Sequence, residues 1–214
     1  MRTLYHYPYS PFSRRTRLAL AHKGLDCELR DPRATPAFAE EVRKLVPFRT
    51  IPVLVDGGRA MGDSTAIVHW LDRAYPSAPR LWPVGEGSAD AFQIAALVDV
   101  VLNGVIDAGT RYYPLRHDAA WLEVKTEMVG RAQKAANALG ERAAALGRGT
   151  VSKDGWSAAD MWLLTLVMWF ESMPARVATT ANIRQVVELG LELPRTLNAW
   201  ADAHRGRDDV KSLG

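Results

Sequence analysis

The sequence predicts an α+β N-terminal domain, with the element order β-α-β-α-β-β-α, followed by an all-α helical-bundle C-terminal domain. Three observations predict this fold class. Strand-like runs rich in aromatic and β-branched residues are confined to the N-terminal part. Residues 77–88 are rich in proline and glycine, which is typical of a linker. Beyond this linker, apolar residues recur at helical spacing. We therefore expect domains over residues 1–76 and 89–214.

The first two expected elements are a strand and a helix. Residues 3–7 are aromatic or β-branched in the main, and Pro8 ends the run. Pro11 suits the first turn of a helix, where a missing N–H costs nothing. Gly24 is placed to close that helix at its C-terminus.

Two hydroxyls, Ser10 and Ser13, lie where this strand gives way to the helix. A helix N-terminus has unpaired N–H groups and partial positive charge, so it favours an anion. Either serine could instead simply cap the helix. The cluster of Arg14, Arg15 and Arg17 has two similar interpretations: a solvated helix face, or help in holding a small anion.

Five more elements complete the expected N-terminal domain. A strand over residues 27–30 and a proline-containing loop precede a short helix over residues 37–45. Residues 50–61 combine an apolar β-branched run, an Asp-Gly turn and a short return strand, which predicts a β-hairpin. Residues 62–64 then open a helix with apolar positions at i, i+3, i+4 and i+7, which ends at residues 75–76.

Two features of this part favour a ligand site. Pro52 removes a backbone donor near the start of a hairpin strand, and a cis bond that turns a backbone edge toward a ligand would explain it. Asp63 and Ser64 stand at a helix start. They could cap the helix, or Asp63 could bind an amine while Ser64 and nearby N–H groups bind a carboxylate.

The C-terminal domain is expected to be helical throughout. The apolar pattern predicts helices over residues 89–108 and 119–146. Residues 157–160 form a capping-box pattern directly before residues 161–170, which are apolar all round and therefore predict a buried central helix. Pro194 begins the last expected helix. The tryptophans expected in the core are Trp162, Trp169 and Trp200.

Composition excludes several classes of protein. A net charge of +3 without a long basic cluster argues against a nucleic-acid partner. We find no apolar run of membrane-spanning length and no signal peptide, and one cysteine cannot form an intrachain disulfide. These features predict a cytoplasmic protein without a membrane partner. Cys27 alternates with Leu29, which predicts a buried structural thiol. The scattered histidines predict no metal site.

Taken together, these motifs resemble the cytosolic glutathione S-transferases. The resemblance rests on residues 10–13 at the strand–helix turn, 50–54 at the hairpin, 63–64 at a helix start and 157–160 in the helical part, so it covers nearly the whole chain. It implies a thioredoxin-like N-terminal domain that binds glutathione as co-substrate, without a metal. It also implies a C-terminal domain that contributes the electrophile site, a homodimer and a bacterial source.

The resemblance assigns a role to individual residues. Ser10 matches the catalytic serine of the tau-like classes, where omega-like members have cysteine; a serine cannot form a mixed disulfide, so conjugation is favoured over disulfide exchange. Pro52 matches a cis proline, and Ile51 the residue that hydrogen-bonds the cysteinyl backbone of glutathione. Asp63 and Ser64 match the pair that holds the γ-glutamyl end, although the family more often has the longer glutamate. The implied glutathione-binding set is Ser10, Phe12, Arg33, Thr50, Ile51, Pro52, Asp63 and Ser64.

Two parts of the implied site stay open. The glycyl carboxylate of glutathione could be bound by Arg33 or by Arg49. Phe12, Asn103, Tyr112 and Tyr113 are expected to line the electrophile site, while simple helix packing is the alternative for the last three. The expected function is conjugation of glutathione to a small hydrophobic electrophile. A glutathione-dependent reductase or isomerase, or a non-catalytic binding protein with the same fold, are the alternatives.

Overall fold

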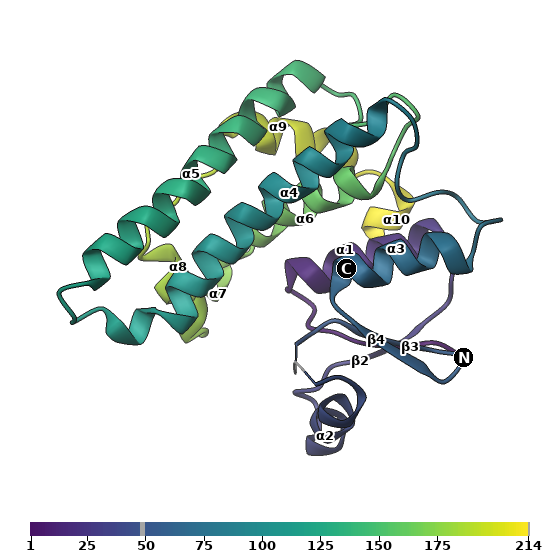
Figure 1. The fold of residues 1–214 in the computed structure, drawn as a ribbon, viewed down its shortest axis with the longest axis horizontal. Coiled ribbons are helices and arrows are strands. Elements are labelled where there is room, and N and C mark those ends of the chain that lie inside the picture. Colours follow the sequence, from purple (N-terminus) through teal and green to yellow (C-terminus); the bar gives the residue numbers. More distant parts are fainter. Residues whose placement is uncertain (48–49, 214) are drawn as a thin grey trace.

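The computed structural model describes residues 1–47 and 50–213 (Figure 1). Both expected parts are present, and the element order of the first part confirms the prediction. The N-terminal part contains β1 (Thr3–Tyr5), α1 (Pro11–His22), β2 (Glu28–Arg30), α2 (Pro36–Leu45), β3 (Val53–Asp56), β4 (Arg59–Gly62) and α3 (Ser64–Ala74). The C-terminal part contains α4 (Gly87–Ile106), η1 (Asp107–Arg111), η2 (Tyr113–Leu115), α5 (Trp121–Leu146), α6 (Ala158–Glu171), α7 (Met173–Arg176), α8 (Ala181–Val187), α9 (Arg195–His204) and α10 (Asp208–Lys211).

The four strands form one mixed sheet in the order β2-β1-β3-β4. β1 runs parallel to β2 and antiparallel to β3, and β3 and β4 form the predicted hairpin. Side chains alternate across the sheet: Leu4 and Leu54 join the core shared with α1 and α3, whereas Tyr5 and Val53 pack with α2. Figure 1 shows α1 and α3 on one face of the sheet and α2 on the other. This is a thioredoxin-like arrangement.

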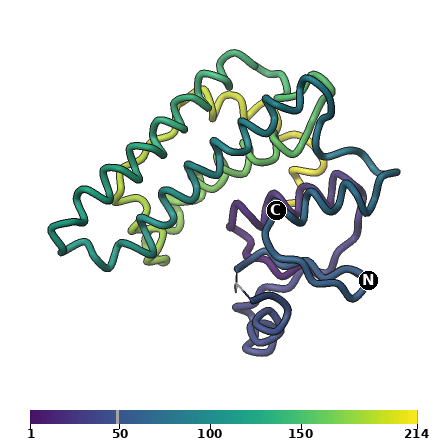
Figure 2. The backbone as a smooth tube through the Cα atoms, in the orientation of Figure 1, coloured from purple at the N-terminus to yellow at the C-terminus, as the bar shows by residue number. Residues whose placement is uncertain are grey.

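The C-terminal bundle is built on two long helices. α4 and α5 pack side by side along much of their length (Figure 2). α6 packs against both α4 and α1, so it joins the bundle to the first part. Most of its side chains are fully buried, which confirms the predicted central helix. The chain then returns to the N-terminal part, where α10 contacts α1 and Arg17 donates to the carbonyl of Ser212 at 2.9 Å.

The predicted capping box begins α6. The Asp160 carboxylate accepts hydrogen bonds from the backbone N and Oγ of Ser157, at 2.9 and 2.7 Å. It also accepts one from the backbone N of Val151 at 2.7 Å, which ties the preceding loop to the helix start. Asp160 is completely buried, so these bonds replace water at the start of the central helix.

Three short helices, α7, α8 and α10, were not predicted from the sequence. Each has only four to seven residues, too few to show a helical period. The end of α4 also differs, because the helix continues as the π-helical turn η1. There Gly109 packs against Val186 so closely that an added Cβ would lie 2.7 Å from its side chain.

Two expectations from the sequence are corrected. The first was that no apolar run reaches the length of a membrane span: residues 87–111 form a helix that is long and apolar enough to do so, with a mean hydropathy of 1.6. In the structure this segment is a bundle helix packed against α5 and α6. Cys27 is only half-buried and Leu29 is 44% exposed, because β2 is a short strand at the edge of the sheet. Burial still raises the pKa of the Cys27 thiol to about 11.

Candidate functional site

A pocket of about 390 Å³ lies where the starts of α1, β3 and α3 meet α4. It gathers six of the residues predicted to bind glutathione, together with Asn103 from the predicted electrophile site. Tyr7 was missed, and its position two residues after β1 and directly before Pro8 is the one sequence signal for it. The lining residues are Tyr7, Phe12, Thr50, Ile51, Pro52, Asp63, Ser64 and Asn103.

The two serines at the start of α1 have different partners. Ser10 is the N-cap, and its Oγ accepts a hydrogen bond from the backbone N of Ser13 at 3.3 Å. Ser13 is fully buried, and its own Oγ accepts from the backbone N of Tyr7 at 3.2 Å. Ser10 is half-buried and does not line the pocket itself, although it lies two residues before Phe12, which does.

The Ile51–Pro52 peptide bond is cis, as predicted. The bond immediately precedes β3, and Pro52 is buried while Ile51 is half-buried. Thr50, Ile51 and Pro52 all line the pocket, so a backbone segment outside the β3 ladder faces it. Arg49, one of the two candidates for the glycyl carboxylate, lies outside the described residues.

Asp63 caps α3 in an unusual backbone conformation. Its φ of +67° is the only positive φ of a non-glycine residue in the described part of the chain. One carboxylate oxygen, Oδ1, accepts from the backbone N of Thr65 and of Ala66, both at 2.9 Å. The other oxygen, Oδ2, makes no hydrogen bond with the described residues and remains available to a ligand in the pocket.

Ser64 is held by an arginine that sequence reasoning did not assign to the site. The Arg15 guanidinium donates from Nε to Ser64 Oγ at 2.9 Å, and from Nη1 to Asp99 Oδ1 at 2.6 Å. It also lies over the rings of Trp162 and Phe12, at 4.0 and 4.8 Å from their centroids. Burial lowers the pKa of Arg15, and the Asp99 carboxylate opposes this shift.

The interpretation of the arginine cluster as a solvated helix face is therefore wrong for two of its members. Arg15 is 2% exposed and Arg14 is 6% exposed. Arg14 donates to the carbonyls of Pro8 at 3.0 Å and Met168 at 3.3 Å. The partners of Arg15, Ser64 and Asp99, lie far along the chain, so no local sequence pattern could predict these contacts.

The remaining predicted residues lie apart from the pocket. Arg33 pairs with Asp31 at 2.6 Å, and its guanidinium lies 4.4 Å from the ring centroid of Tyr7, a lining residue. Tyr112 lines a separate cavity of about 160 Å³ near the start of α5. The hydroxyl of Tyr113 hydrogen-bonds the Glu188 carboxylate. Of the four expected electrophile residues, the structure brings together Phe12 and Asn103 only.

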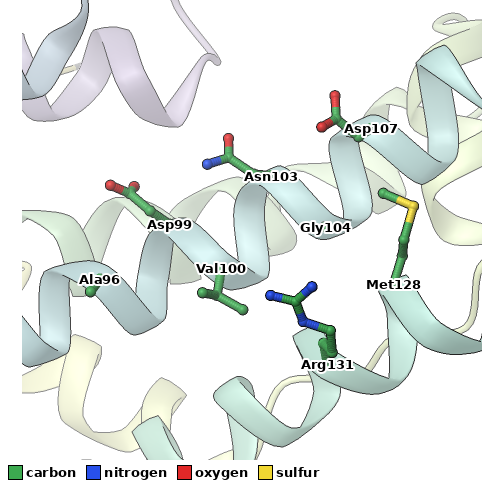
Figure 3. Close-up of a pocket in the computed structure, with 8 residues that line it drawn as sticks. All are labelled: Ala96, Asp99, Val100, Asn103, Gly104, Asp107, Met128 and Arg131. Carbon is green, nitrogen blue, oxygen red and sulfur yellow. The ribbon is translucent and has the colours of Figure 1, made fainter.

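A second pocket of about 510 Å³ lies beside the first, between α4 and α5. Asn103 lines both pockets. Figure 3 shows Asp99 and Asn103 of α4 and Asp107 of η1 extending from the same side, while Arg131 points in from α5. Among the described residues, no group of three histidine, cysteine, aspartate or glutamate side chains could hold a metal ion.

The N-terminal part of the chain is similar to one known family. Residues 4–79 match the family model described as the N-terminal domain of glutathione S-transferase. Residues 4–79 are therefore similar to the N-terminal domain of glutathione S-transferases. The matched region includes every described residue of the pocket except Asn103.

Individual relatives extend this likeness. A probable glutathione S-transferase, GSTU1, of Oryza sativa subsp. indica is 36% identical over 112 residues, which cover 50% of this chain and 48% of that protein. The chain thus spans about half the length of this curated relative. A probable maleylacetoacetate isomerase of Vibrio cholerae is 40% identical over 98 residues, 44% of each chain.

Solved structures match the whole chain. A glutathione S-transferase of Methylobacillus flagellatus, solved with glutathione bound, is 22% identical and has a TM-score of 0.75. The match covers 100% of this chain and 99% of that one. Both the N-terminal domain and the helical C-terminal domain therefore have the fold of glutathione S-transferases.

Proposed function

We propose that the protein is a glutathione transferase, which binds glutathione in the 390 Å³ pocket and activates its thiol as a thiolate for conjugation to a small hydrophobic electrophile. The observation that carries this proposal is the convergence in one pocket of a cis-proline backbone edge, the Asp63–Ser64 helix start and the wall formed by Phe12. The relatives that share the domain support it.

The start of α3 fits the γ-glutamyl end of glutathione, which carries an amine and a carboxylate. Asp63 Oδ2 is free to accept from the amine, since Oδ1 is occupied by the helix N–H groups. Arginine can only donate, so the Arg15 bond fixes Ser64 Oγ as an acceptor and leaves the Ser64 hydroxyl hydrogen to donate to a carboxylate. Arg15 is thus a positioning residue for Ser64.

Ser10 is the group proposed to meet the sulfur. Its Oγ already accepts from Ser13, so its hydrogen remains to donate to a thiolate at the start of α1. The cysteinyl backbone of glutathione would then lie along Ile51, beside the cis bond. Arg33 and Arg49 remain the two candidates for the glycyl carboxylate; the Arg33 guanidinium lies 4.4 Å from the ring centroid of the lining residue Tyr7.

The free energies involved are sufficient without a general base. A free thiol has a pKa of about 8.5, so only a few per cent is thiolate at neutral pH. Lowering that pKa by about two units takes roughly 2.7 kcal/mol. A hydrogen bond to a charged group supplies about 1.5–3 kcal/mol, and a helix N-terminus adds about 0.3–1 kcal/mol. The Ser10 hydroxyl and the start of α1 together therefore account for the shift.

A glutathione-dependent isomerase is the second candidate. The observation that favours it is the similarity to a probable maleylacetoacetate isomerase over 98 residues. An isomerase would use the same thiolate and would release glutathione unchanged. Disulfide reduction is less well supported, since Ser10 provides no second sulfur.

Glutathione affinity with an electrophile panel tests the proposal. We expect wild-type protein to be retained on immobilised glutathione and to conjugate at least one aryl chloride. Asp63→Asn should weaken glutathione binding by tenfold or more, because a charge-assisted hydrogen bond is worth about 1.5–3 kcal/mol. Asp118→Asn, on an exposed residue that does not line this pocket, is the matched control. Failure of both retention and conjugation would favour a binding protein that keeps only the fold.

A further inference from the structure

Two tyrosine rings lie in the segment before Ser10, and a guanidinium lies over each of them. Tyr7 and Tyr9 stand on either side of Pro8, directly before Ser10. Arg33, from the loop before α2, lies 4.4 Å from the Tyr7 ring centroid. Arg176, from α7 of the C-terminal domain, lies 4.6 Å from the Tyr9 ring centroid. Both domains thus place a cation on the segment that leads to Ser10.

The two cations differ in their partners. Arg33 is neutralised by Asp31, with which it makes a bidentate contact at 2.9 and 2.6 Å. Arg176 donates to Ser172 Oγ at 3.2 Å and has no carboxylate partner among the described residues. Burial lowers the pKa of Arg176, as does the nearby positive charge of Arg33, while Tyr9 opposes the shift. The Arg176 charge is therefore partly desolvated and uncompensated.

The surrounding groups do not compensate this charge. A third guanidinium, that of Arg14, lies 5.4 Å from the same Tyr9 ring and is buried. The nearest acid along the chain, Glu171, is occupied by Arg205, with contacts of 2.5 and 2.6 Å. Among the described residues, the two guanidinium groups at the Tyr9 ring, those of Arg14 and Arg176, therefore have no anionic side chain to pair with.

We propose that the electrophile carries a carboxylate and that Arg176 binds it at the Tyr9 ring. The inference rests on the proposed transferase function and names its substrate class: an apolar electrophile with one anionic group. A planar guanidinium matches a carboxylate with two parallel hydrogen bonds, and stacking on an aromatic ring fixes the plane of that fork. Tyr9 is 47% exposed and Arg176 is half-buried, so a substrate can reach them.

The chemistry of transfer is unchanged by this assignment. With an aryl chloride, the glutathione thiolate donates an electron pair to the ring carbon, the C–S bond forms, and chloride leaves with the electrons of the C–Cl bond. The carboxylate takes no part in these steps. Arg176 is accordingly a specificity-determining residue, and its loss should act on substrate binding.

Two pairs of probes separate charge from shape. The reactive pair is 4-chloro-3,5-dinitrobenzoate and its methyl ester, compared by conjugation kinetics. The unreactive pair is 3,5-dinitrobenzoate and its methyl ester, titrated by calorimetry into the glutathione-saturated protein. Arg176→Gln should raise KM and Kd for the acids by tenfold or more, as expected for loss of a hydrogen bond to a charged group, and leave the esters within about twofold.

Further variants decide between recognition and a general structural effect. Arg176→Lys keeps the charge and should recover part of the preference for the acids. Arg148→Gln removes an equal charge from an exposed position after α5 and should change nothing. Equal effects of Arg176→Gln on acids and esters, or none on either, would overturn the proposal. Arg176-dependent binding of the acids without any conjugation would keep the anion site and reject the transferase function.

Discussion

Ser10 and Ser64 have the same arrangement of hydrogen bonds. Each Oγ accepts from a donor of the protein: the backbone N of Ser13 in one case and the Arg15 guanidinium in the other. Since a hydroxyl has one hydrogen, both side chains are left to donate outward. This suits a thiolate at Ser10 and a carboxylate at Ser64, the two negatively charged parts of glutathione that these residues are proposed to meet.

His6 is expected to make folding sensitive to mild acid. It is 6% exposed, and its Nδ1 has no hydrogen-bond partner in the described part of the chain. Burial, and secondarily the charge of Arg17, lowers the pKa of His6 to about 4. The unfolded chain binds a proton near pH 6.5, so between about pH 6.5 and 4 it holds more protons than the folded chain. Folding stability is therefore lost as pH falls through this window.

Urea denaturation at several pH values measures this effect. The lowered pKa of His6 corresponds to a loss of roughly 3 kcal/mol at most in the free energy of unfolding between pH 6.5 and 4. His6→Gln should show a smaller fall in the free energy of unfolding over that range, whatever its stability at neutral pH. His117→Gln, on an exposed histidine, should keep the wild-type slope. If the free energy of unfolding falls equally with pH in wild type and in His6→Gln, His6 is not a buried, neutral side chain in the folded protein.

At the scale of elements, α6 shows what the sequence can predict. Its capping box and continuous apolar run are local signals, and the structure has both where they were expected. The cis Ile51–Pro52 bond and the Asp63 cap are also local, which is why the core of the candidate site could be anticipated. The short helix α8 has no such signal, because its stability comes from packing beside η1.

Long-range contacts were beyond sequence reasoning. The bonds of Arg15 reach Ser64 and Asp99, 49 and 84 residues away, so the charge run around it looked solvated. Tyr112 and Tyr113 were expected near the electrophile, but the π-helical turn η1 changes the course of the chain just before them. Helical periodicity alone cannot indicate such a turn.

Removing the Asp160 carboxylate should destabilise the whole fold. Asp160→Ala leaves three donors, from Ser157 and Val151, without their acceptor at a fully buried position. A buried donor without a partner costs about 1–3 kcal/mol, so we expect a loss of roughly 3 kcal/mol or more. Ser157→Ala should cost about 0.5–2 kcal/mol. Urea unfolding followed by tryptophan fluorescence measures both.

Asp154→Ala is the control for this loop. Asp154 lies two residues after Ser152 in the loop before α6, and its carboxylate takes no part in the capping box. It should unfold close to the wild-type midpoint. A loss for Asp160→Ala no larger than that for Asp154→Ala would contradict the assigned role of the capping box.

For the whole molecule, we predict a homodimer through the outer face of α4. Only 39% of the apolar window in residues 87–111 is buried within one chain. Phe92 and Val100 are 44% and 38% exposed on α4, and β4 is an edge strand that would gain cover in a dimer. Light scattering at micromolar concentration should give twice the 23.6 kDa mass of one chain.

Charged substitutions locate this interface. The double variant Phe92→Glu and Val100→Glu should shift the mass toward that of a monomer, because a charge buried at an interface is costly. Val187→Glu changes an equally exposed apolar residue on α8 and should remain dimeric. A wild-type monomer would refute the dimer, and a dimeric double variant would refute the α4 interface.

The most direct test of the proposed function is the ultraviolet thiolate absorbance of the glutathione complex, titrated against pH for wild type, Ser10→Ala and Ser13→Ala. The wild-type complex should titrate well below the free thiol value of about 8.5. Ser10→Ala should raise the thiol pKa by about one to two units, through loss of a hydrogen bond worth about 1.5–3 kcal/mol. Ser13→Ala should leave it unchanged, because Ser13 is buried against Tyr7. A shift with Ser13→Ala and none with Ser10→Ala, or a wild-type complex that titrates like free glutathione, would contradict the account.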